Sequence, residues 1–117
     1  MSYIYLIHPD GSEASKVSEE LKKAGLNVYH EPENIDLASR MIKQNPPSVV
    51  VIFLTSQSEE GMEIAGGLMK NRATADIPVV FVGGSAIVKV NAQRRFEDAY
   101  LVEEDELAGV LGFLVEG

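Results

Sequence analysis

Short apolar runs recur along the chain and predict the strands of a sheet. Residues 3–7, 49–54 and 77–82 are almost continuously apolar and rich in β-branched and aromatic side chains. Such runs are typical of strands that are covered on both faces. Residues 26–29 alternate between apolar and polar side chains, which predicts an outer strand, and residues 99–102 form a further short run. The pattern therefore predicts five strands.

Each run is followed by a segment in which apolar residues recur every three or four positions, as on one face of a helix. Asp10 or Ser12 can cap the first helix, and Gly25 can end it in a left-handed conformation. The second helix ends before Pro46 and Pro47, and the third covers about residues 59–71. The segment around residues 86–95 is a poor helix because several of its residues are β-branched. The predicted inward faces are Ala14, Val17, Leu21 and Ala24; Ile35, Ala38, Met41 and Ile42; Met62, Ile64, Ala65 and Leu68; and Leu107, Val110, Leu111 and Leu114.

The alternation of strands and helices predicts the topology. Strands joined by helices form a parallel sheet with helices on both faces, and the crossovers are right-handed. The prediction is an α/β fold, a three-layer, doubly wound, five-stranded sheet of flavodoxin type with strand order 2-1-3-4-5. No repeat, low-complexity tract or linker divides the chain, so we expect residues 1–117 to form one domain.

Composition narrows the function further. The chain has 10 Lys+Arg against 18 Asp+Glu, a formal net charge of −8, which disfavours direct binding of nucleic acid. It has no cysteine, which excludes disulfides and thiolate metal sites. It also lacks an apolar stretch approaching the ~20 residues of a membrane helix and the basic start of a secretory signal. We expect a soluble, cytoplasmic protein without a membrane partner.

Ligands of open α/β sheets bind beyond the carboxyl ends of the strands. The segments there are residues 8–10, 55–57, 83–85 and 103–104. The glycine-rich patterns of nucleotide-binding loops are absent. Gly83 and Gly84 could cradle an anion, but a plain turn is the favoured interpretation. No nucleophile–base pair is evident, so we expect no enzyme activity. We also expect no cofactor and no metal.

Three separated segments carry a resemblance to the receiver domains of two-component response regulators. Residues 47–54 followed by residues 60–63 resemble the third strand, phosphorylation loop and third helix of that family. Residues 73–80 are similar to the segment that introduces the fourth strand, and residues 99–102 to the start of the fifth. The resemblance implies a receiver-like fold over almost the whole chain.

The family's phosphorylation chemistry does not carry over. The resemblance places two Mg²⁺-binding acids at the end of the first strand, a phosphoacceptor aspartate at the end of the third, a hydroxyl at the end of the fourth and Lys-Pro at the end of the fifth. Phenylalanine cannot accept a phosphoryl group, and glutamate in place of lysine would repel one. The corresponding residues here are His8 and Pro9, Phe53, Gly83, and Glu103 and Glu104.

Two residues of this degenerate phosphorylation pocket have alternative roles. Asp10 matches a third acidic position of the family and could form a weak cation site with Glu103 or Glu104, but a helix cap is the favoured role. His8 could act as a phosphohistidine or general base, but no triad order is present, and we expect a solvent-facing loop histidine.

The resemblance also points to an interaction surface on the fourth helix, fifth strand and fifth helix. Tyr100 stands where the family carries a switching aromatic residue, and we expect packing to fix its ring. Exposed apolar side chains on this surface would favour a partner, although ordinary core packing is the slightly favoured expectation for each taken singly. The candidate residues are Ile87, Val90, Arg94, Arg95, Tyr100 and Phe113.

These observations predict a pseudo-receiver, a signalling module that works without phosphorylation by binding a protein partner or forming a homodimer. One alternative is a receiver-like switch that responds to a small molecule, anion or cation at the carboxyl edge of the sheet. An enzyme on the same scaffold is a third hypothesis, which the fold permits.

Overall fold

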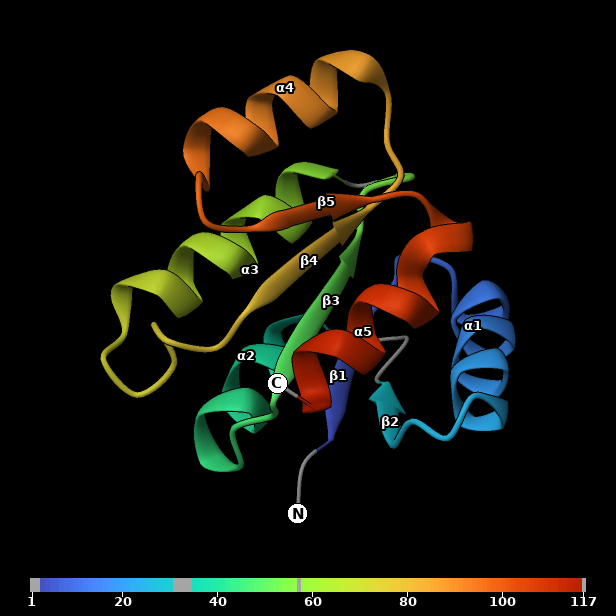
Figure 1. Ribbon diagram of the computed structural model, residues 1–117. Coiled ribbons are helices and arrows are strands. Elements are labelled where there is room, and N and C mark those ends of the chain that lie inside the picture. Colours follow the sequence, from blue (N-terminus) through green and yellow to red (C-terminus); the bar gives the residue numbers. More distant parts are fainter. Residues whose placement is uncertain (1–2, 31–34, 57, 117) are drawn as a thin grey trace.

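The computed structural model describes residues 3–30, 35–56 and 58–116, which fold as five successive strand–helix units. Figure 1 shows the twisted sheet with helices on both sides. The elements are β1 (Ile4–Ile7), α1 (Gly11–Lys23), β2 (Val28–His30), α2 (Ile35–Gln44), β3 (Val49–Phe53), α3 (Ser58–Lys70), β4 (Val79–Val82), α4 (Ala86–Arg95), β5 (Tyr100–Val102), the 3₁₀ turn η1 (Glu104–Glu106) and α5 (Leu107–Glu116).

All strand pairs are parallel, and the strand order is β2-β1-β3-β4-β5, as the sequence predicts. Ile4 pairs in register with Val28 on one side and with Val49 on the other, which places β1 and β3 in the middle of the sheet. The predicted doubly wound fold is therefore confirmed.

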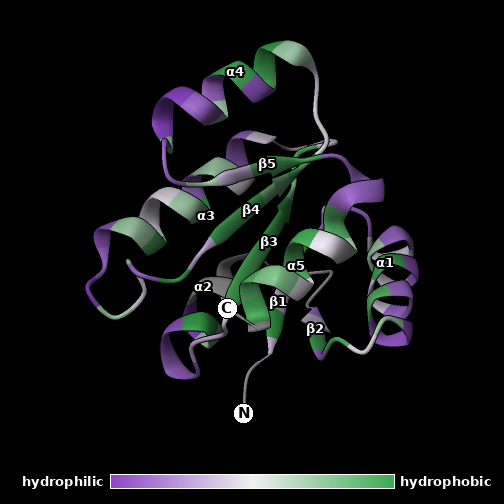
Figure 2. Cartoon of the chain, in the orientation of Figure 1, coloured by the Kyte–Doolittle hydropathy of each residue, from purple (hydrophilic) through white to green (hydrophobic). Residues whose placement is uncertain are grey.

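Alternate strand residues supply two separate apolar cores. Val50 and Ile52 of β3 face a core shared with α2, α3 and α4, whereas Val51 and Phe53 face a core shared with α1 and α5. This division explains why β3 is apolar at every position. Figure 2 shows the same arrangement, with hydrophobic strands inside and hydrophilic residues on the outward face of α1.

Most predicted elements differ from the observed ones only at their ends. β4 begins at Val79, not at residue 77, because Pro78 has no N–H to donate, although its carbonyl accepts from the Val50 N–H at 3.0 Å. Gly25 follows the end of α1 with a φ of +90°, the left-handed conformation that the sequence predicts. Ala24, expected on the inward face of α1, is exposed and caps the helix instead. The side chains of Ile35 and Ala38 lie outside the described residues.

None of the helices in the described part of the chain is long and apolar enough to cross a membrane.

Candidate functional site

The carboxyl edge of the sheet collects residues from four strand ends. His8 follows β1, Phe53 ends β3, Gly83 follows β4 and Glu103 follows β5. Because the strands are parallel, these ends meet at one edge of the sheet. Thr55 and Ser56, which follow β3, are exposed there, and Gln57 lies outside the described residues.

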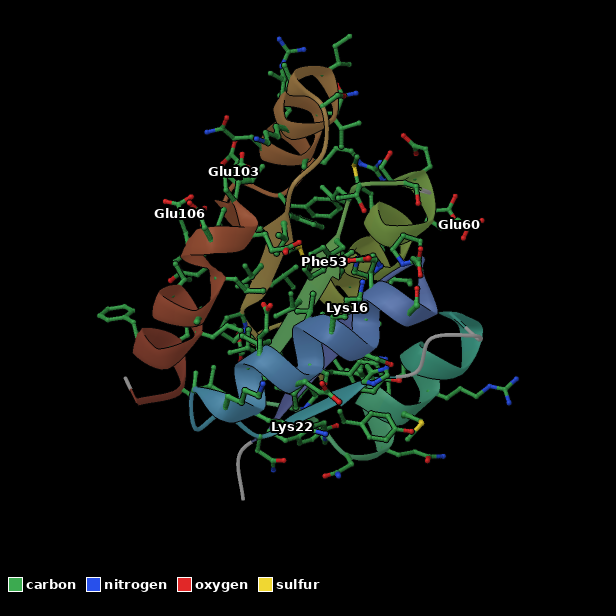
Figure 3. All side chains as sticks on the ribbon, turned by 90° about the vertical axis from the view of Figure 1, so that its right-hand side faces the viewer. Lys16, Lys22, Phe53, Glu60, Glu103 and Glu106 are labelled. Carbon is green, nitrogen blue, oxygen red and sulfur yellow. The ribbon has the colours of Figure 1, made fainter. Side chains whose placement is uncertain are left out.

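Two rings in contact, tilted by 34° to each other, fill the middle of this edge. The His8 imidazole and the Phe53 ring have centroids 4.4 Å apart, and the two residues are 7% and 2% exposed. Figure 3 shows Phe53 in the interior, with Glu103 and Glu106 at the surface. The expectation of a solvent-facing His8 is therefore wrong. The rings shield each other from water because β1 and β3 are neighbours, which the sequence near His8 does not reveal.

His8 is held in one orientation by the backbone. Its Nδ1 accepts a hydrogen bond from the Asp10 N–H at 3.0 Å. Burial lowers the pKa of His8, while the carboxylates of Asp10, Glu13 and Glu104 act in the opposite direction. The neutral imidazole is thus the form that suits this position, because only it leaves Nδ1 free to accept.

Asp10 acts as the predicted cap of α1. Its Oδ1 accepts hydrogen bonds from the Ser12 N–H at 2.9 Å, the Ser12 hydroxyl at 2.8 Å and the Glu13 N–H at 3.2 Å. The Ser12 hydroxyl, helped by the two N–H groups, lowers the pKa of Asp10. Pro9 beside it is partly buried, and Glu104 is exposed on η1. Asp10 therefore stabilises the start of a helix.

Two glycines with left-handed backbone follow β4. Gly83 and Gly84 have φ angles of +71° and +95°, which residues with a Cβ rarely adopt. A Cβ at Gly83 would lie 3.0 Å from the Thr55 methyl carbon, so no hydroxyl-bearing side chain fits there without movement. Ser85 then caps α4 by accepting from the Val88 N–H at 3.3 Å. The positive φ angles suit both a plain turn and an anion cradle, so the favoured interpretation as a turn stays a prediction.

An ion pair occupies the end of β5. The Lys89 ammonium of α4 contacts the Glu103 carboxylate, and the Glu103 N–H donates to the Glu106 carboxylate at 3.0 Å. Sequence reasoning missed Lys89, because only the position of α4 beside β5 brings it to Glu103. The pair places a cation and an anion where the receiver resemblance expects a single lysine.

The chemistry available at this edge is correspondingly limited. Within the described ranges, no group of three or more His, Asp and Glu side chains is placed to hold a metal ion. Phe53 has no oxygen that could attack a phosphoryl group. The Lys89–Glu103 pair neutralises itself, so it offers little net charge to an incoming anion.

The predicted interaction surface carries unusually exposed apolar side chains. Ile87 is 74% exposed and Val90 46% on α4, and Phe113 is 72% exposed on α5. The expectation that each packs in the core is wrong for Ile87 and Val90, because α4 buries only Ala92 completely, and it is also wrong for Phe113 on α5. Tyr100 is 41% exposed on β5, and Arg94 and Arg95 are exposed at the end of α4. That packing fixes the Tyr100 ring stays a prediction.

Solved structures with the same architecture identify the fold. The chain matches a response regulator signal receiver domain from Bermanella marisrubri at 20% identity, with a TM-score of 0.79 and coverage of 98% of this chain and 99% of that one. It matches the chemotaxis protein CheY4 of Vibrio cholerae at 14% identity and a TM-score of 0.79, covering 97% and 98% of the two chains. The chain has the receiver-domain fold.

A de novo designed Rossmann 2x3 protein is also similar, at 14% identity and a TM-score of 0.77, covering 100% of this chain and 92% of the design. The receiver-like architecture therefore does not by itself carry a signalling function. No protein-family model and no curated protein matches the sequence. The function of this chain therefore depends on the residues of the edge and of the exposed surface.

Proposed function

We propose that this protein is a phosphorylation-independent signalling module, a pseudo-receiver that works by protein–protein contact and forms a homodimer through α4, β5 and α5. The exposed apolar residues Ile87, Val90 and Phe113 carry the proposal. Ile87 and Val90 lie three positions apart and so on one side of α4, whereas Phe113 lies on α5, beyond β5; exposed apolar side chains of this size are typical of interaction sites when a partner covers them. Their exposure in an acidic, charged chain indicates that a partner covers them.

The two rings in contact support the independence from phosphorylation. A phosphoryl acceptor at the end of β3 would need an oxygen nucleophile and a nearby cation, and this position holds the buried Phe53 against His8. The nearest acid along the chain from His8 is Asp10, whose carboxylate already accepts three hydrogen bonds from its own helix end.

Charge favours a second copy of the chain as the partner. The basic residues Arg94 and Arg95 end α4, just before β5 begins. The acidic residues 103–106 follow the end of β5. A two-fold axis near β5 would therefore bring the basic end of one α4 toward η1 of the second copy. Such an isologous contact uses the same surface on both subunits.

The oligomeric state tests the proposal directly. We expect a dimer in analytical ultracentrifugation that Ile87→Ser with Phe113→Ser converts to a monomer of unchanged stability. Arg94→Glu should weaken the dimer because it places a like charge against η1. Glu19→Ser, an exposed change on α1, is the matched control and should leave the dimer intact. A monomeric unaltered chain, or a dimer that these variants leave unchanged, contradicts homodimerisation through this surface.

An amide NMR titration with Mg²⁺ and then beryllofluoride, which mimics an aspartyl phosphate, tests the independence from phosphorylation. We expect no shifts at His8, Phe53 or Gly83. Shifts at these residues, with Tyr100 following, would instead favour the ligand-responsive switch.

A further inference from the structure

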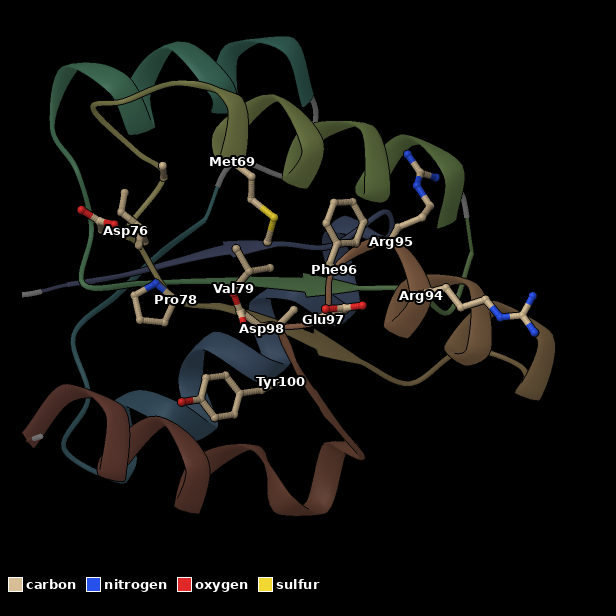
Figure 4. A pocket seen from close by; sticks show the side chains of 13 residues that line it. Met69, Asp76, Pro78, Val79, Arg94, Arg95, Phe96, Glu97, Asp98 and Tyr100 are labelled. Carbon is tan, nitrogen blue, oxygen red and sulfur yellow. The ribbon is translucent and has the colours of Figure 1, made fainter.

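A groove of about 770 Å³ opens at the amino edge of the sheet, opposite the carboxyl edge described above. Its walls come from the segment that leads into β4 and from the end of α4 with the turn into β5. Figure 4 shows the side chains that line it. Its volume lies in the range of about 300–1,000 Å³ that is typical of ligand-binding clefts.

The floor of the groove is apolar and formed largely by the folded core. Val79 and Phe96 are buried, and Met69 is partly buried beside them. The Phe96 ring packs against Phe81 with centroids 5.4 Å apart, which fixes its position. Tyr100 stands at the side of the groove with 41% of its surface exposed. The accessible apolar surface of the groove therefore comes from Met69, Ile77 and Tyr100, which a large apolar side chain could cover without rearrangement of the core.

Carboxylates surround this floor. Asp76 precedes β4, and Glu97 and Asp98 follow α4; all are exposed, and none forms an ion pair with another described residue. In Figure 4, Asp98 lies beside Val79, with Glu97 next to it along the chain.

The two arginines of the lining do not balance these carboxylates. Arg95 already interacts with α3 and with its neighbour Phe96. Its Nη1 lies 3.6 Å from a Glu59 oxygen, and its guanidinium carbon lies 5.3 Å from the centre of the Phe96 ring. Arg94 extends away from the other lining residues in Figure 4. The groove therefore presents net negative charge above an apolar floor.

We propose that this groove binds an extended segment of a partner protein in which a lysine or arginine adjoins a large apolar side chain. The apolar side chain would cover Met69, Ile77 and the Tyr100 ring, and the cation would meet the carboxylates of Glu97 and Asp98. Charge-assisted hydrogen bonds to exposed carboxylates suit a basic segment, and the Tyr100 ring offers a cation–π contact. The inference goes beyond the proposed homodimer because it names another partner, and the groove shares Arg94, Arg95 and Tyr100 with the surface proposed for the homodimer.

Peptide binding followed by amide NMR tests the proposal. The probes are acetylated hexapeptides in which two arginines flank leucine, phenylalanine or tryptophan. We expect shifts at residues 75–79 and 94–100 that weaken with added salt. Glu97→Gln with Asp98→Asn should weaken binding about tenfold, the effect of one charge-assisted hydrogen bond. Glu19→Gln with Glu20→Gln on α1 makes the same charge change outside the groove and should leave binding unaltered.

Three results would overturn the proposal: no binding by any of these peptides, shifts that fall outside the groove, or equal binding of peptides with glutamate in place of arginine. Measurement of the oligomeric state distinguishes failure of the peptide-binding proposal from failure of the proposed homodimer. Ile87→Ser with Phe113→Ser should leave peptide binding intact, whereas the Glu97 and Asp98 variant should leave the dimer intact.

Discussion

Phe53 closes the carboxyl end of β3, and its replacement by alanine is the strongest single test of how this edge is built. The side chain is 2% exposed and contacts His8 with ring centroids 4.4 Å apart. Removal of a buried phenylalanine ring costs about 3–5 kcal/mol, from lost burial and from the cavity that remains. A domain of this size is stable by only about 5–15 kcal/mol, so Phe53→Ala should be severely destabilised.

A double-mutant cycle isolates the contact between the two rings. We expect Phe53→Leu and His8→Leu each to reduce stability, and the two together to cost less than the sum by about 0.5–1.5 kcal/mol, the range for aromatic ring pairs. The hydrogen bond from the Asp10 N–H is lost in both variants that lack His8, so it cancels in the cycle.

Phe53→Asp addresses function through the same position. The change places a carboxylate where the receiver resemblance expects one, but it buries that carboxylate against an apolar core. It should therefore cost more than Phe53→Ala, because an unpaired buried charge adds to the cavity. We expect the variant to be largely unfolded and not to gain an acceptor site.

Urea unfolding followed by circular dichroism measures these effects, since the chain contains no tryptophan for fluorescence. With a slope of about 2 kcal/mol per molar urea, a loss of 4 kcal/mol lowers the midpoint by roughly 2 M. A loss below about 1 kcal/mol for Phe53→Ala, or no coupling in the cycle, would refute the ring-contact account of the edge.

Three further predictions follow from local contacts. Burial lowers the pKa of His8, so the unfolded chain binds a proton at higher pH than the folded chain; the free energy of unfolding should fall as the pH drops below about 6.5. Urea titrations at stepped pH should show a smaller decline for His8→Gln, and equal declines would contradict this role. Gly67→Ala on α3 should add up to about 1 kcal/mol of stability because nothing lies within 4 Å of the new Cβ. Gly61→Ala on the same helix should instead destabilise the protein, because its Cβ would lie 2.7 Å from a β3 side chain. If thermal melting shows that Gly67→Ala and Gly61→Ala shift the melting temperature in the same direction, the packing around Gly61 is not as described. Lys89→Met removes the exposed ion pair with Glu103 and should lower the free energy of unfolding by less than about 1 kcal/mol, and by less still in high salt. A large loss of stability that does not depend on salt would contradict the surface character of the pair.

The order and type of the elements could be predicted from the sequence because each depends on a local period. The run at residues 49–54 is apolar at every position, and such a run can only be covered on both faces of a sheet. Asp10 and Gly25 marked the ends of the first helix through short-range effects, hydrogen bonding to the next N–H groups and a left-handed backbone. The ends of strands were less certain, as Pro78 shows, because pairing with a neighbouring strand decides them.

The candidate site was predictable only in its location. The parallel topology brings His8, Phe53, Gly83 and Glu103 to one edge, which follows from the element order. Their contacts depend on residues far away in the chain. His8 is buried because β3 lies beside β1, and Glu103 is paired because α4 places Lys89 near the end of β5.

The sequence by itself determined the five strand–helix units and the doubly wound topology, because periodicity and residue chemistry are local properties. Only the tertiary structure decided which apolar residues remain at the surface and where carboxylates gather over an apolar floor. Ile87 and Val90 are exposed because α4 meets the core mainly through Ala92. The amino-edge groove exists because the turns before β4 and β5, separated in sequence, lie side by side. Exposure and clefts depend on what packs against a residue, and that is a property of the whole fold.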